Sequence, residues 1–164
     1  MKSSLKLALV AIILLFLNQV SAAQQLQMPQ QGTTTYVTYY IIRILTTLNM
    51  GDVGSEDLRE LVGITRNIDG QKFFDGMTAR CIQYEETVGS VADYHGACVE
   101  TDSDGDKVFT TFKSGSVRLH TLVGGTGKYK GISGTAAYTG KPLPSPGEGY
   151  LANIVEHKVT WQFK

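Results

Sequence analysis

The chain has 164 residues, of which 42% are hydrophobic and 18% are charged. This length suits a single domain, and the balance of apolar and charged residues excludes an intrinsically disordered chain. Fifteen basic residues are matched by fifteen acidic ones. A nucleic-acid-binding protein needs a basic surface to neutralise phosphates, so no nucleic-acid partner is expected.

The first 23 residues have the pattern of a secretory signal peptide. Lys2 and Lys6 give a positive start, residues 7–17 form an apolar run, and small residues follow at 20–23. The alternative, a membrane-spanning helix, needs roughly 20 apolar residues, and this run is shorter. We therefore predict an exported protein, secreted or periplasmic, with no stable membrane anchor.

The remaining chain is predicted as a short lead-in followed by one domain. Residues 24–32 are polar and aperiodic, which indicates a flexible lead-in, and the domain is expected over residues 33–164. Residues 55–61 are the only helix-like stretch, and a helical turn or a charged strand edge would fit them equally well. Seventeen of the eighteen glycines lie after residue 50 and separate strand-sized segments.

Eight segments rich in β-branched and aromatic residues are predicted to be strands. Hairpin turns such as Asp69-Gly70 and Asp104-Gly105 separate several of them. Eight antiparallel strands in a chain of this length predict an all-β fold, a small closed antiparallel β-barrel. The predicted strands are residues 34–48, 58–67, 73–88, 91–101, 107–113, 117–123, 129–139 and 153–163.

The first and last predicted strands supply candidate residues for a ligand in the barrel interior. Residues 153–163 alternate between apolar and polar side chains, which places His157 and Trp161 on the inward face. Residues 34–48 add Tyr40 and Arg43 as candidates. Arg43 lies in an otherwise apolar segment, where it would either face inward and neutralise a carboxylate ligand or face outward to solvent.

Cys81 and Cys98 are the only cysteines, and an exported chain favours a disulfide between them. If Gly89-Ser90 forms a two-residue hairpin turn, the numbers of facing residues sum to 179, and the two cysteines face each other. They then occupy a non-hydrogen-bonded pair, in which side chains come closest. We predict a disulfide with Cα atoms about 4.4 to 6.8 Å apart.

A glycine-rich segment, VGGTGKYKGISG at residues 123–134, does not match either nucleotide-binding motif. The dinucleotide fingerprint fails by one position, and the P-loop fails because Tyr129 replaces the required Ser or Thr. We therefore interpret the glycines as structural residues of a tight connection between strands, with a new strand starting at Tyr129. The motif glycines are Gly124, Gly125, Gly127, Gly131 and Gly134.

This segment resembles the GGTG-K-aromatic segment of dirigent proteins and the GGSG-x-F-x-G segment of plant allene oxide cyclases. Exported bacterial proteins of the same barrel class have similar segments to residues 96–112 and 124–134. The resemblance implies an eight-stranded antiparallel barrel, allene oxide cyclase-like or dirigent-like, and, by analogy, a homo-oligomer, dimer or trimer. It transfers no catalytic residue to this chain, and the matched glycines carry no chemistry.

Other chemistry-bearing patterns are weak. Residues 102–106 are rich in Asp, but Gly105 stands at the wrong position for an EF-hand, so a hairpin turn is favoured over a surface calcium site. The three histidines, His95, His120 and His157, lack metal-ligand spacing, and no Ser-nucleophile motif occurs. No metal and no cofactor are expected. His95 should face Tyr84 across the hairpin.

Three functions remain open from the sequence. The first is an exported barrel that binds a small, mostly apolar molecule in its interior. The second is a cyclase or isomerase of the allene oxide cyclase type, with His157 and Glu85 as candidate catalytic residues. The third is a structural or surface-interaction protein without a ligand, which predicts a filled interior and an exposed apolar patch.

Overall fold

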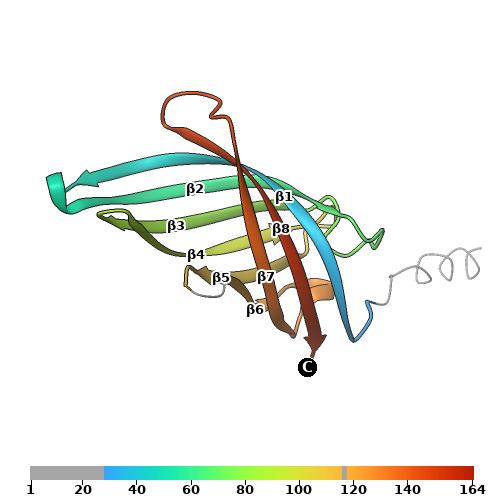
Figure 1. Ribbon diagram of the computed structural model, residues 1–164. Coiled ribbons are helices and arrows are strands. Elements are labelled where there is room, and N and C mark those ends of the chain that lie inside the picture. Colours follow the sequence, from blue (N-terminus) through green and yellow to red (C-terminus); the bar gives the residue numbers. More distant parts are fainter. Residues whose placement is uncertain (1–27, 116–117) are drawn as a thin grey trace, which may run out of the picture.

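The computed structural model describes residues 28–115 and 118–164, and its eight antiparallel strands pair in chain order into a closed barrel (Figure 1). The predicted fold class is therefore confirmed. The predicted signal peptide, residues 1–23, lies outside the described residues. The strands are β1 (Gln31–Asn49), β2 (Gly54–Asn67), β3 (Thr78–Val88), β4 (Val91–Thr101), β5 (Lys107–Lys113), β6 (Leu119–Gly125), β7 (Ile132–Leu143) and β8 (Tyr150–Phe163).

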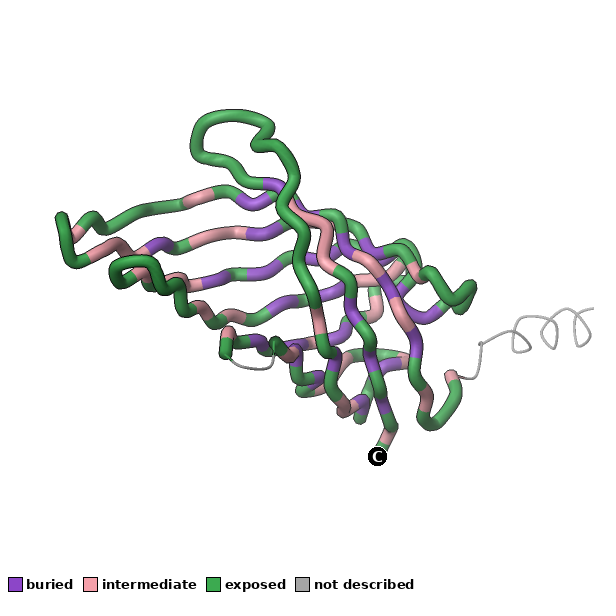
Figure 2. Tube along the Cα trace, viewed as in Figure 1, coloured by how far each residue is buried: buried purple, intermediate pink, exposed green. Residues whose placement is uncertain are grey.

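Buried and exposed residues alternate along the strands, as Figure 2 shows along the chain trace. In β1 the side chains of Tyr36, Tyr40 and Ile42 are buried, whereas Tyr39 and Ile41 between them are exposed. Successive side chains of a strand point to opposite faces of the sheet, so the even-numbered residues of β1 fill the barrel. Two clusters of buried side chains result, one in each half of the barrel.

One half of the barrel is filled by the connection between β2 and β3. Phe73, Phe74 and Met77 belong to this loop and are buried in the core. The Phe74 ring stacks on Tyr36 at a centroid distance of 4.4 Å, and the Phe73 ring lies 4.4 Å from that of Trp161. The prediction that a strand begins at residue 73 is therefore wrong, because these aromatic side chains plug the barrel end and β3 begins at Thr78.

One side chain, that of Asn67, makes four of the hydrogen bonds that hold the plug in place. Asn67, the last residue of β2, donates from Nδ2 to Thr34 Oγ1 and to the Phe73 carbonyl oxygen, at 2.8 and 2.7 Å. Its Oδ1 accepts from the backbone N–H groups of Asp69 and Gln71. A single amide thus satisfies backbone groups that a loop would otherwise leave unpaired.

Two local expectations need correction, and one open alternative is decided. Residues 55–61 belong to strand β2, preceded only by the short 3-10 turn η1 (Gly51–Val53), so the strand alternative is the one present and the helical turn is not. Tyr129 does not begin a strand; it ends the 3-10 turn η2 (Gly127–Tyr129), and β7 starts at Ile132. β1 starts at Gln31, three residues before the predicted strand start at residue 34, because Gln31 and Gly32 pair with β8.

The predicted disulfide is present. The hairpin register is also the predicted one, in which the numbers of facing residues sum to 179. β3 and β4 pair Val88 with Val91 and Cys81 with Cys98. The two sulfur atoms are bonded, and the Cα atoms are 4.0 Å apart. This distance is below the predicted window and close to the roughly 4.5 Å that separates the Cα atoms of a non-hydrogen-bonded pair.

Some glycines of the glycine-rich segment lie where a side chain would clash with neighbouring atoms. A Cβ on Gly134 would lie 2.1 Å from the Thr160 carbonyl oxygen, and one on Gly127 would meet the Asp106 carboxylate. Both residues have positive φ angles, 153° and 51°. These two positions therefore require glycine for the close approach of β7 to β8 and for the turn before it.

Candidate functional site

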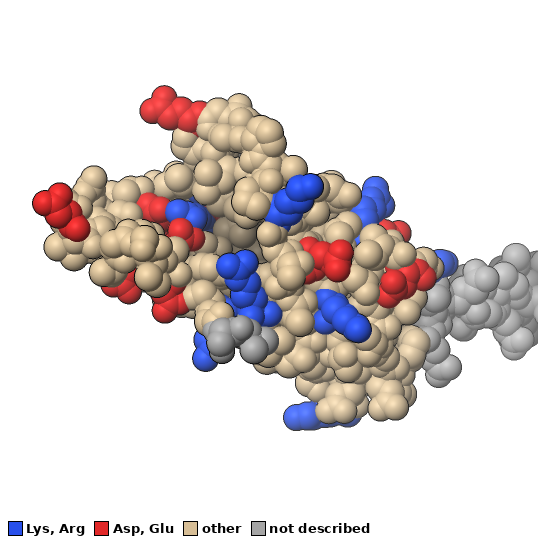
Figure 3. Space-filling model, in the orientation of Figure 1, with Lys and Arg blue, Asp and Glu red and all other residues tan. Residues whose placement is uncertain are grey.

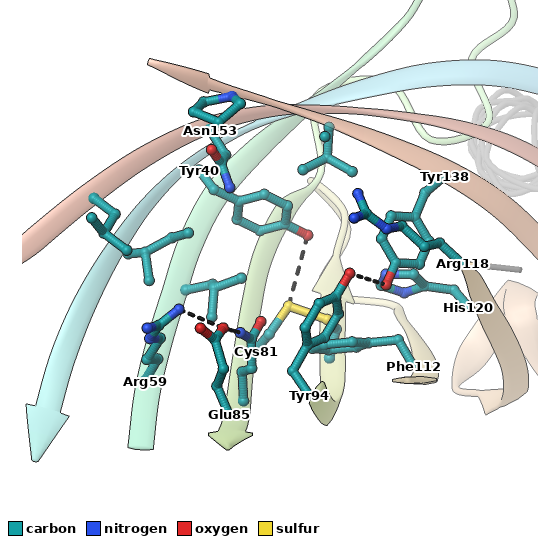
Figure 4. A pocket seen from close by; sticks show the side chains of 18 residues that line it. Tyr40, Arg59, Cys81, Glu85, Tyr94, Phe112, Arg118, His120, Tyr138 and Asn153 are labelled. Atoms are coloured by element: carbon teal, nitrogen blue, oxygen red, sulfur yellow. Dashed lines mark hydrogen bonds and ion pairs between the residues drawn. A yellow bond between two sulfur atoms is a disulfide. The ribbon is translucent and has the colours of Figure 1, made fainter. Parts of the chain in front are cut away.

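The other half of the barrel contains a cavity of about 230 Å³ that the plug does not reach (Figure 4). Apolar side chains from β1, β2, β5 and β8 form much of its wall, and the Cys81–Cys98 disulfide forms another part. Binding sites for small molecules are typically concave and mostly apolar, with a few polar groups that fix orientation. The apolar wall residues are Ile42, Leu61, Phe112, Leu151 and Val155.

Polar groups enter the cavity from several strands. The Tyr40 hydroxyl donates to Cys81 Sγ at 3.7 Å, and the hydroxyls of Tyr138 and Tyr94 are hydrogen-bonded at 3.2 Å. His120 lies beside them with Nδ1 3.2 Å from Thr110 Oγ1. Burial lowers the pKa of His120 to about 4, so the imidazole is neutral at neutral pH.

An arginine with two acidic partners forms one side of the cavity. Arg59 lies 2.6 Å from Asp57 and 2.5 Å from Glu85, and all three side chains are largely buried. Glu85 also accepts from Gln83 Nε2 at 2.8 Å. The Asp57 pKa is lowered, since its hydrogen bonds to Thr47 and Arg59 outweigh the opposing effect of burial. The charge of Arg59 is thus compensated within the wall.

A layer of buried polar side chains lies between the cavity and the plug. Glu100 is fully buried, and its one hydrogen bond comes from the Tyr36 hydroxyl at 3.4 Å. Burial raises the pKa of Glu100 to about 7. His157 stacks on Tyr36 at 4.5 Å and meets His120 edge-on at 5.0 Å, and burial lowers its pKa. The carboxyl and both imidazoles are therefore held in or near their neutral forms.

The four candidate ligand residues lie in four different environments. Tyr40 lines the cavity, whereas Trp161 packs in the plug and His157 lies in the polar layer below the cavity floor. Arg43 points outward and pairs with Glu60 at 2.9 Å, with 54% of its side chain exposed. The inward alternative for Arg43 is therefore wrong, because its odd-numbered position lies on the outer face of β1.

The two candidate catalytic residues are not brought together. Glu85 lies in the cavity wall beside Arg59, whereas His157, in β8, lies in the buried polar layer and does not line the cavity. Sequence reasoning missed seven polar residues that line the cavity: Arg59, Gln83, Tyr94, Arg118, His120, Tyr138 and Asn153. Tyr94 could have been found, because it shares the parity of Cys98 in β4 and so must face inward with the disulfide.

The acidic turn at residues 102–106 is neutralised from within the chain. The Lys128 ammonium lies 2.7 Å from Asp102 and 2.5 Å from Asp104, where a bound cation would be expected. In residues 28–115 and 118–164, no three His, Cys, Asp or Glu side chains are grouped as metal ligands would be. The structure thus favours the hairpin-turn interpretation of this segment over a calcium site.

Elsewhere on the surface, charges of both signs are interspersed. Figure 3 shows Lys and Arg among Asp and Glu side chains over one face, which is hollowed near its centre, with basic side chains at the edge of the hollow. Among the residues that the structure describes, no helix is long and apolar enough to cross a membrane. On the outer face, Tyr84 and His95 face each other as expected, with ring centroids 5.3 Å apart.

A search of solved structures finds a pterocarpan synthase dirigent protein that is similar to this chain. The TM-score is 0.50 with 14% sequence identity, and the match covers 84% of this chain and 89% of that protein. No family model matches the chain, and no curated protein matches it in sequence. At this identity the likeness shows the fold alone, which is the dirigent-like barrel that the glycine-rich segment implied.

Proposed function

We propose that this protein binds a small, mostly apolar molecule in the open half of its barrel. The observation that carries the proposal is the cavity itself: its wall is mostly apolar, while the opposite half of the barrel is filled by the plug. The interior of an eight-stranded barrel has room for side chains or for one small ligand. Here the aromatic plug fills one half with side chains and leaves the other half for a ligand. The internal disulfide and the fold are compatible with an extracellular location.

Native mass spectrometry of the protein purified from its natural host tests this proposal. The expected result is a retained small molecule that organic extraction removes. Leu61→Trp would fill the cavity and abolish retention, while Val62→Trp, at the neighbouring exposed position, is the matched control. Val155→Phe fills the same space from β8 if Leu61→Trp does not fold. Retention that survives cavity filling in a folded variant would overturn the proposal.

The cyclase or isomerase alternative is favoured by one observation. That hypothesis requires a carboxylate or imidazole near the cavity, and both Glu85 and His120 line it. A shaped cavity accelerates the rearrangement of an already reactive molecule by orienting it, with few reactive side chains. The two functions differ in outcome, because a binding protein returns its ligand unchanged and an isomerase returns a product of equal mass and different structure.

The third alternative, surface interaction, is favoured by apolar side chains on the outer face of β1, β2 and β3. Exposed apolar patches of this kind mark protein interaction sites. Light scattering of the wild type and of an Ile41→Lys, Val62→Lys double variant tests whether the chain associates with itself through this face; an unchanged mass would exclude it. The exposed residues are Tyr39, Ile41, Val62, Ile64 and Ile82.

A further inference from the structure

The two arginines that line the cavity differ in how their charges are compensated. Arg59 has a carboxylate on each side, at 2.6 and 2.5 Å. Arg118 stands on the opposite side of the cavity, beside Tyr138 (Figure 4). Burial raises the pKa of the Tyr138 hydroxyl, and the positive charge of Arg118 acts in the opposite direction, which places that charge close to the phenol.

Arg118 has no acidic partner in this structure. No carboxylate among residues 28–115 and 118–164 lies within 4.0 Å of its guanidinium group. The rest of the chain, residues 1–27 and 116–117, contains no Asp or Glu at all. The cavity therefore presents one uncompensated positive charge at its edge, and that charge attracts an anion.

The tyrosine hydroxyls in the cavity are hydrogen-bond donors that are weakly used or unused within the chain. Tyr40 donates only to a disulfide sulfur, which is a weak acceptor. Tyr94 and Tyr138 share one hydrogen bond between two hydroxyls, which leaves one of the two protons unused. The one carboxylate that lines the cavity, Glu85, is already occupied by Arg59 and Gln83. The cavity is thus complementary to a ligand whose oxygen atoms accept hydrogen bonds.

The size of the cavity limits the apolar part of such a ligand. Its volume of about 230 Å³ is below the roughly 300 to 1,000 Å³ that drug-sized ligands occupy. The rings of Tyr40, Phe112 and Tyr138 form part of its wall, which favours an aromatic or similarly flat group.

From these features, and resting on the proposed binding function, we propose that the ligand is a small aromatic carboxylic acid. Its ring occupies the apolar cavity, and its carboxylate pairs with Arg118 and accepts from the free phenol protons. A guanidinium group binds a carboxylate in a bidentate fashion, which fixes orientation as well as charge. Arg118 is thereby a specificity-determining residue, and Arg59 is a structural residue of the wall.

Isothermal titration calorimetry with a matched pair of ligands tests the proposal. The pair is 3-phenylpropanoate and 3-phenylpropanol, which share their carbon skeleton and differ in charge, measured at pH 7 and physiological ionic strength. We expect the acid to bind about tenfold or more tightly than the alcohol, as a charged hydrogen bond contributes. In Arg118→Gln the acid should lose this advantage, while the affinity of the alcohol stays within about twofold.

Lys113→Gln is the matched control, since it removes the same charge from the outer face of β5, where Lys113 pairs with Leu119 next to Arg118. In this variant the ratio of the affinity for the acid to the affinity for the alcohol should remain that of the wild type. Equal affinities of acid and alcohol in the wild type would overturn this inference and leave the binding function standing. An equal fall of this affinity ratio in Arg118→Gln and in Lys113→Gln would also overturn the inference. Failure of both ligands to bind would count against the binding function itself.

Discussion

Glu100 offers the sharpest test of the barrel interior, because ionisation of a fully buried carboxyl makes the stability of the fold depend on pH. Its only hydrogen bond comes from the Tyr36 hydroxyl, and Oε2 has no partner among the described residues. The other polar groups near it, Thr38 and Tyr40, carry no charge at neutral pH. Glu100→Gln keeps the size and shape of the side chain and removes the ionisation.

The expected magnitude follows from the pKa of this carboxyl. Burial raises the pKa of Glu100 from its ordinary 4.5 to about 7. The folded protein therefore holds this proton more tightly than the unfolded chain, and stability is lost as pH rises from 4.5 through about 7. The rise in pKa corresponds to about 3 kcal/mol. The Gln variant, which has no proton to lose, should gain about this much stability relative to wild type between pH 5 and pH 8.

Urea denaturation at pH 5, 6, 7 and 8, with the disulfide intact, measures this difference. The buried histidines titrate in both proteins, so their effect cancels when the free energies of unfolding are subtracted. Glu148→Gln, in the exposed loop before β8, is the matched control. A difference between Glu100→Gln and wild type that does not change with pH would refute the assignment of Glu100 as a buried carboxyl that resists ionisation.

Three further substitutions probe the structural features that stabilise the barrel. Replacing both Cys81 and Cys98 with Ala should lower the free energy of unfolding by about 3 kcal/mol, and a urea midpoint equal to wild type would contradict the role of the disulfide. Phe74→Ala removes the centre of the plug and should cost about 3 to 5 kcal/mol in the same assay; a cost below about 1 kcal/mol would mean that the loop does not close the barrel. Gly134→Ala should destabilise by roughly 1 to 3 kcal/mol, because a Cβ there would meet the Thr160 carbonyl at 2.1 Å, whereas Gly140→Ala, with nothing nearer than 4.0 Å, should change thermal stability little.

Local pattern was enough to predict the eight strands and the disulfide, although not the starts of β3 and β7. The hairpin at Gly89-Ser90 sets its register by turn geometry alone, so the pairing of Cys81 with Cys98 follows from counting. Glu100 is two residues from Cys98 in β4, so strand alternation places its side chain inside the barrel as well. A buried carboxyl is not expected from composition alone.

Features that depend on distant parts of the chain could not be predicted. Residues 36–42 are apolar on both faces of β1, so alternation gives no signal for the direction of Arg43. Phe73 and Phe74 have the composition of a strand, but tertiary packing against Tyr36 and Trp161 draws them into the plug. Arg59 and Arg118 reach opposite sides of one cavity only because the barrel closes.

Methyl NMR tests the central claim, that the open half of the barrel holds the ligand, most directly. On titration with 3-phenylpropanoate, methyl signals of Ile42, Leu61 and Val155 in the cavity wall should shift. Those of Val108, Ile132 and Val159 beside the plug should stay unchanged. Shifts confined to outward methyls such as Val62 and Ile82, or to the plug half, would contradict the account.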